Sequence, residues 1–147
     1  MNRLAITLFL TFFAVAGTAS ATAPDLTVIT PGHEHWVEQP DHTSTAILYG
    51  DPSKAGLYIM LVKLPPNWSE GAHYHSQREN VTVVAGTAYL GLGKKFDKNA
   101  VTAYTAGTFA SIPAKTPHYA LTKSQSAVLQ LVAVGPYQEI MIAGRAM

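Results

Sequence analysis

The 147-residue sequence contains no cysteine, so disulfides and a thiolate-bound structural zinc are excluded. Charged residues are also scarce, at 13% of the chain, and they nearly balance. The chain has ten lysines and arginines and nine aspartates and glutamates, for a formal net charge of +1. Because nucleic-acid-binding domains are typically strongly basic, we expect no nucleic-acid partner. The length predicts a single domain that is large enough to bury a core.

Long apolar runs are absent except at the N-terminus. Arg3 precedes an apolar run over residues 4–17, and the small residues 19–21 follow it. This order is typical of a secretory signal peptide, and the run is shorter than the roughly 20 residues that a membrane-spanning helix needs. We therefore predict a signal peptide over residues 1–21, a secreted or periplasmic location, and no membrane attachment after its removal.

Sustained helical periodicity is missing from residue 24 onward, and short β-rich runs alternate with turn signals instead. The pattern predicts strands over residues 25–30, 45–49, 56–64, 80–84, 87–92, 101–104, 108–112, 118–122, 127–134 and 137–142. Gly86 is interpreted as a tight turn between two of them. So many short strands indicate an all-β sandwich or barrel. We divide the mature chain into an N-terminal extension (residues 22–44) and a β-barrel domain (residues 45–147).

The segment from Gly71 to Glu79 carries the main chemical signal. Side chains alternate along an extended strand, so His73, His75 and Glu79 are expected on one face. His118 lies in another strand-like stretch and is expected to complete the group. Three imidazoles and a carboxylate suit one divalent metal ion, with zinc, iron, manganese and nickel all compatible. Ordinary burial of these residues without a partner would be costly, which favours the metal interpretation.

A reaction is harder to predict than a metal site. Four protein ligands leave coordination positions open on an ion that prefers five or six, which allows Lewis-acid or redox chemistry. No second carboxylate stands out as a general base, so Glu79 is the candidate for both ligand and proton acceptor. The residues expected to form a pocket for a small, partly apolar or aromatic ligand are Tyr58, Met60, Phe109 and Ala120. Simple core packing is the alternative role for this last group.

A second histidine cluster precedes the predicted barrel. It consists of His33, Glu34 and His35, with His42 nearby. One hypothesis is an accessory metal site or a lid over the barrel mouth. The favoured interpretation is a solvated polar loop.

The histidine motifs resemble those of the cupin superfamily. The first cupin motif matches at His73, His75, Glu79 and Gly86, and the second at Gly107, Pro113 and His118. Asn67 and Lys115 stand where the two motifs carry further glycines, and Thr122 stands where the second motif ends in asparagine. The resemblance implies a double-stranded β-helix, which is a jelly-roll barrel with the metal in its interior.

Segments 50–54, 64–66 and 89–97 are similar to small, single-domain exported cupins and to the cupin modules of zinc-binding anti-sigma factors. This resemblance implies a metal-binding protein with two candidate roles. One is a metal-dependent enzyme, of oxygenase or isomerase type, that acts on a small molecule. The alternative is a non-catalytic periplasmic module that binds or senses a metal or ligand. A purely structural β-sandwich is the third interpretation. Exposed sheet edges also suggest a homodimer.

Overall fold

The computed structural model describes residues 26–142, and this part of the chain contains ten β-strands and no helix. The strands are β1 (Val37–Glu38), β2 (Ser44–Tyr49), β3 (Gly56–Leu64), β4 (Ser69–His75), β5 (Glu79–Leu92), β6 (Thr102–Thr105), β7 (Phe109–Ile112), β8 (His118–Leu121), β9 (Ala127–Gly135) and β10 (Glu139–Met141). Every pairing between strands is antiparallel. The all-β prediction is confirmed.

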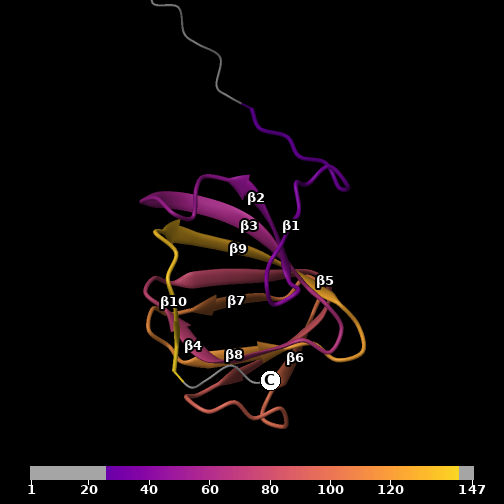
Figure 1. Ribbon diagram of the computed structural model, residues 1–147, viewed down its shortest axis with the longest axis vertical. Coiled ribbons are helices and arrows are strands. Elements are labelled where there is room, and N and C mark those ends of the chain that lie inside the picture. The colour runs from indigo at the N-terminus through magenta and orange to yellow at the C-terminus, as the bar shows by residue number, and fades with distance from the viewer. Residues whose placement is uncertain (1–25, 143–147) are drawn as a thin grey trace, which may run out of the picture.

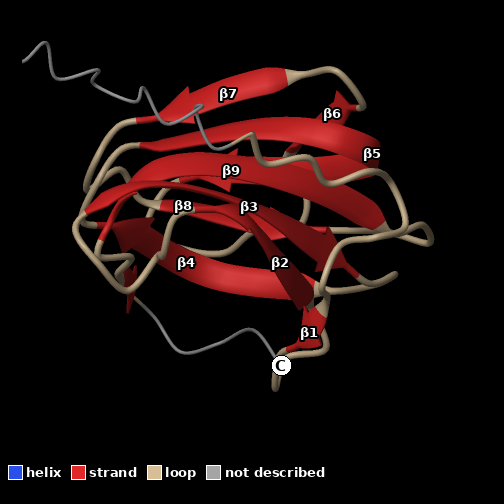
Figure 2. Cartoon of the chain, turned by 90° about the horizontal axis from the view of Figure 1, so that it is seen from above, coloured by secondary structure: helices blue, strands red, loops and turns tan. Residues whose placement is uncertain are grey.

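Two curved sheets face each other and share one strand (Figures 1 and 2). The first sheet has the order β1-β2-β3-β9-β5-β7, and the second has the order β10-β4-β8-β5-β6. The N-terminal half of β5 pairs with β9 and β7, whereas its C-terminal half pairs with β8 and β6. Because β5 bends from one sheet into the other, the sheets close into the predicted double-stranded β-helix.

The most regular part of the barrel is the ladder between β3 and β9. Pairing runs without a shift from Gly56 opposite Gly135 to Leu64 opposite Ala127. Alternation therefore holds along β3, and Tyr58 and Met60 on its inner face are buried. They form a core cluster with Leu131 and Ala133 of β9.

The predicted turn at Gly86 is wrong, because β5 continues through it as one 14-residue strand. The pairing with β9 shifts register between Val83 and Ala85, and Gly86 has a φ of 73°. A side chain there would collide with the backbone oxygen of Ser126. Glycine is thus required by a β-bulge, which bends the strand between sheets rather than ending it.

The N-terminal extension also differs from the expectation. No strand forms over residues 26–30, where one was predicted. Instead β1 pairs with β2, so the end of the extension belongs to the first sheet. Within the described residues, no helix has the length and apolar character that crossing a membrane requires. The predicted signal peptide, residues 1–21, lies outside the described residues.

Candidate metal centre

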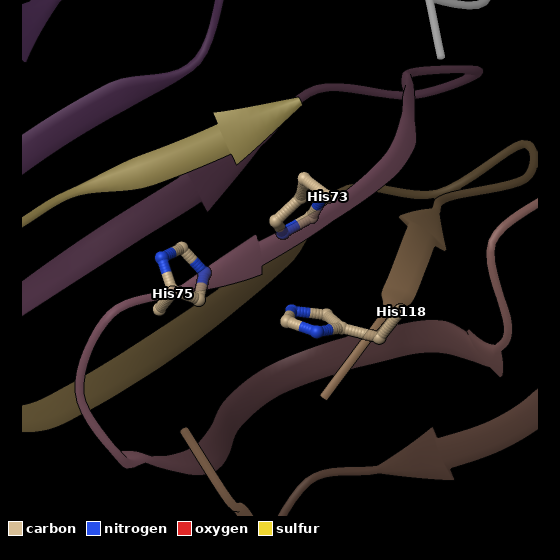
Figure 3. A group of neighbouring side chains, drawn as sticks. All are labelled: His73, His75 and His118. Atoms are coloured by element: carbon tan, nitrogen blue, oxygen red, sulfur yellow. The ribbon is translucent and has the colours of Figure 1, made fainter. Parts of the chain in front are cut away.

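Three histidine side chains from two neighbouring strands converge inside the barrel. His73 and His75 project from β4, and His118 projects from β8, where it pairs directly with His73 (Figure 3). All three residues are buried, and their ligand nitrogens lie within 4.8 Å of one another. Metal–nitrogen bonds of about 2.1 Å put opposite ligands on one ion roughly 4 Å apart, so this spacing is of the right scale. The three-histidine group could hold a metal ion.

Backbone carbonyls orient all three rings. The Nδ1 atom of His73 lies 2.9 Å from the oxygen of Gly71, and that of His118 lies 2.9 Å from the oxygen of Thr116. The Nδ1 atom of His75 lies 3.3 Å from the oxygen of Gln138. A carbonyl only accepts, so each Nδ1 must carry the proton and donate it. Each Nε2 then keeps its lone pair for a metal, as in well-ordered metal sites.

Glu79 faces the same centre from the first residue of β5. Its Oε2 atom lies 3.5 Å from Nε2 of His75 and 3.7 Å from Nε2 of His118. The structure therefore brings the four predicted ligands together, but not by alternation along one strand. Residues 76–78 leave β4 and return the chain into β5. The turn, rather than the strand period, places Glu79 beside the histidines.

Burial controls the charges at this centre. It raises the pKa of Glu79 to about 7, with help from the negative charge of Glu139. Burial also lowers the pKa of His75 to about 4, and the neighbouring rings of His73 and His118 act in the same direction. The pKa of His118 likewise falls to about 4 because of burial. At neutral pH these two imidazoles are uncharged, which is the form that binds metal.

A second carboxylate, Glu70, lies beside the histidines and was missed by the sequence reasoning. Its Oε2 atom is 3.6 Å from Nε2 of His73. Glu70 lies three positions before His73, a spacing that would place them on opposite faces of a regular strand. However, β4 advances three residues here while β8 advances two, from Ala120 to His118. This bulge places the Glu70 side chain on the same face as the histidines. The local strand pattern does not predict the bulge.

Glu70 belongs to an acidic group at one wall of the cavity. Burial raises its pKa well above the ordinary value, and the nearby carboxylates Glu139 and Asp41 raise it further. Glu139 in turn accepts a hydrogen bond of 3.0 Å from the hydroxyl of Tyr137. Glu70 is therefore held largely protonated near neutral pH, next to the three-histidine group.

The histidines and both carboxylates line a cavity of about 510 Å³. Met60 and Ala120, which were predicted to line a pocket, do so. Tyr58 instead fills the core and lines a small neighbouring crevice, and burial raises its pKa to about 12. Phe109 is 63% exposed and lies outside the cavity, contrary to the expectation. Its neighbours Ala110 and Ile112 line the cavity.

Both departures from the glycine positions of the cupin motifs keep a glycine-like backbone. Asn67 has a φ of 58° and Lys115 a φ of 61°, in the left-handed region. The backbone amide of Lys115 donates a 2.8 Å hydrogen bond to the oxygen of His75. The loop before β8 thus supports the end of β4 despite the substitution.

The second histidine cluster lies apart from this centre. His33, His35 and His42 are exposed, and Nδ1 of His42 lies 3.5 Å from a carboxylate oxygen of Glu38. Within residues 26–142, the group of His73, His75 and His118 is the one cluster of metal-ligating side chains detected. This arrangement agrees with the solvated-loop interpretation.

Comparisons with known proteins agree with the barrel fold. The protein-family model for the cupin domain matches residues 60–135, which is more than half of the chain. The polyketide cyclase RemF from Streptomyces resistomycificus has a similar structure, with a TM-score of 0.68 and 19% identity over 82% of this chain and 87% of that one. An RmlC-like cupin from Shewanella frigidimarina gives a TM-score of 0.59 and 13% identity, over 75% and 91%.

A sugar phosphate isomerase of the cupin superfamily from Silicibacter pomeroyi is similar as well. Its TM-score is 0.51 and its identity 21%, over 63% of this chain and 59% of that one. No curated protein sequence matches this chain significantly. At these identities the structural likenesses show the fold alone.

Proposed function

We propose, from the premise that this chain belongs to the cupin family, that it is a metal-dependent enzyme acting on a small molecule. His73, His75, His118 and Glu79 would hold one divalent ion, which would supply Lewis-acid or redox chemistry at an open coordination position. Glu70 is the proposed proton donor and acceptor. The reaction classes that this arrangement favours are isomerisation, elimination and oxygenation.

The observation that carries this proposal is the common orientation of the three imidazoles. Each Nδ1 is bound to a backbone carbonyl, so three Nε2 lone pairs remain available inside a cavity of about 510 Å³. A purely structural site would be closed by its own ligands, whereas this site opens into a cavity with room for a ligand.

Glu70 supports catalysis rather than binding alone. Its carboxyl group lies at the cavity wall beside the histidines, within reach of a ligand there. A general acid works best when its pKa lies near the working pH, and burial raises the pKa of Glu70 towards that pH. Glu70 is thus a second carboxylate beside the histidines, which the sequence pattern did not predict.

Metal loading combined with one substitution tests the proposal. The purified chain would be loaded separately with zinc, manganese, iron and nickel, and screened against phenols and small carbonyl compounds. Glu70→Gln should keep the metal-to-protein ratio but lower turnover by roughly 10²–10⁴-fold, the usual range for a general acid or base. Glu38→Gln, at an exposed glutamate on β1, is the matched control and should change neither quantity.

The non-catalytic alternative predicts a different result. A binding or sensing module would take up the metal and show no turnover in any metal form, and Glu70→Gln would have no kinetic effect. Failure of all four metals to bind would contradict both functions and favour a purely structural barrel.

Export and homodimerisation accompany this proposal as expectations from the sequence. Fractionation of cells that produce the full chain, with and without residues 1–21, tests the export signal. Light scattering on the purified protein tests the dimer. A full-length chain retained with its first residue in place would contradict the export prediction.

A further inference from the structure

The cavity wall contains several acidic groups, and among the described residues its basic side chains are histidines. Four carboxylates line it: Asp41, Glu70, Glu79 and Glu139. Among the described residues, no lysine or arginine does. The exposed Lys123 places its Nζ atom 4.3 Å from the centroid of the Tyr89 ring, but Lys123 is not part of the lining.

Aliphatic side chains make up much of the remaining wall, which extends well beyond the histidines and also includes Gln39, Thr43, Thr45 and Thr108. Along β5, Glu79 is followed on the inner face by Val81 and Val83, and all three line the cavity. At the far end the lining includes Trp68, which precedes β4 by one residue. Trp68 lies five positions before His73, which corresponds to roughly 16 Å at the rise of an extended strand. The Nε1 atom of Trp68 donates a 3.4 Å hydrogen bond to Oδ2 of Asp41, so the cavity has polar groups at both ends and an aliphatic stretch between them.

We infer, on the basis of the proposed function, that the substrate is an uncharged, largely apolar molecule with one oxygen-bearing end. The oxygen-bearing end would lie at the histidines, and an aliphatic or aromatic body would lie against the aliphatic side chains of β3, β5 and β9 that line the cavity. The class includes phenols, enols and ketones with a ring or long carbon skeleton. Organic acids and phosphate esters of similar size are excluded from it.

The charge balance explains this selectivity. Four carboxylates line the cavity, and among the described residues no lysine or arginine lines it. An anionic ligand would lose its hydration on entry without gaining a lysine or arginine partner from the protein, and it would lie close to these carboxylates in a low-dielectric environment.

The shape of the wall adds a preference for apolar bodies. Many of its lining side chains are aliphatic, and Met60, Val83 and Leu131 among them are also part of the hydrophobic core. Burial of a hydrocarbon body against them would contribute roughly 25 cal/mol per Å² of apolar surface removed from water.

A matched pair of probes tests the inference by isothermal titration calorimetry. The probes are 1-naphthol and 1-naphthoate, which share a ring system and differ in charge at neutral pH. Both are titrated into metal-free and into zinc-loaded full-length protein. We expect 1-naphthol to bind at least tenfold more tightly than 1-naphthoate in both forms.

One charge substitution assigns the selectivity to the wall. Glu139→Lys places a cation at the exposed rim of the cavity and should reduce the preference for 1-naphthol by at least threefold. Glu38→Lys makes the same change on an exposed strand away from the cavity and should leave the preference unaltered. Equal effects of the two substitutions would overturn the role of the wall charges.

Two further results would overturn the inference. These are equal or tighter binding of 1-naphthoate in either form, and no binding of 1-naphthol at all. The metal-to-protein ratio is measured on the same samples. A normal ratio together with preferred naphthoate binding would reject the substrate class while leaving the proposed metal-dependent function standing. Failure to load zinc would instead count against that function.

Discussion

The two ends of the cavity differ in how the burial of their side chains affects stability. At one end, His73, His75 and His118 meet the buried Glu79 and the partly buried Glu70, whose pKa values are raised by removal from water. At the other end, Leu64, Val83 and Ala88 form an apolar cluster that Trp68 and Tyr104 pack against. Burying ionisable groups costs stability, whereas burying aliphatic groups supplies it. The apolar end therefore stabilises the barrel, whereas the polar end carries the candidate metal site.

The largest expected effect comes from removing one histidine at the polar end. His118→Ala should weaken metal binding by more than 100-fold, because loss of a ligand exceeds the 10–100-fold cost of losing a group that merely orients one. Metal-free His118→Ala should unfold close to the wild-type midpoint, since one histidine hydrogen bond is worth about 1 kcal/mol. Equilibrium dialysis measures the metal affinity, and denaturant unfolding measures the unfolding midpoint.

His42→Ala is the control for this experiment, because His42 is exposed and outside the cavity. Unchanged metal affinity in His118→Ala would contradict the assignment of the metal to the polar end.

A substitution in the apolar wall should give the reverse pattern. Leu131 is 5% exposed and packs with Tyr58 and Met60. Leu131→Ala should lower the free energy of unfolding by about 2–5 kcal/mol, through lost burial and an enlarged cavity. Its metal affinity should stay within about twofold of wild type. Parallel loss of metal binding and stability would show that the two ends do not act separately.

Lowering the pH should weaken metal binding at the polar end and leave the apolar end unaffected. Metal binding requires ionised Glu79, whose pKa is raised to about 7, while His75 and His118 stay neutral down to pH values near 4. As the pH falls from 7 towards 4, metal must displace a proton from Glu79. The apparent affinity should therefore drop by about tenfold per pH unit and level off above 7.

Glu79→Gln removes that proton, so its weaker metal affinity should stay nearly constant over the same range. Metal titrations at several pH values compare the two proteins. A wild-type slope that persists in Glu79→Gln would assign the proton to another group.

The smallest effect is expected outside both ends, at Lys115. Its positive φ of 61° strains a residue with a side chain, and glycine relieves that strain at some cost in chain entropy. Lys115→Gly should therefore stabilise the protein by about 0.5–1 kcal/mol without altering metal affinity. Thermal unfolding measures the gain, and a clear loss of stability would contradict it.

Strand alternation predicted the barrel well where the ladders are regular. The β3 range was predicted to the residue, and its inner positions Tyr58 and Met60 are buried. Pairing with β9 runs there without a shift, so a period of two applies over the whole strand. The cupin-like histidine spacing likewise identified three residues that meet in space.

The same reasoning failed where a ladder is irregular. Glu70 was missed because the bulge in β4 reverses the face on which its side chain lies, and Gly86 was read as a turn because a bulge glycine and a turn glycine look alike in sequence. Phe109 was placed inside, although the alternation of β7 turns Ala110 and Ile112 inward instead. Bulges depend on long-range pairing, which a local pattern does not contain.

Anomalous diffraction from crystals of the zinc-loaded chain would locate the metal ion itself. We expect one strong peak per chain inside the barrel, about 2.0–2.1 Å from the Nε2 atoms of His73, His75 and His118. A peak at His33 and His35, or no peak between the three buried rings, would contradict it.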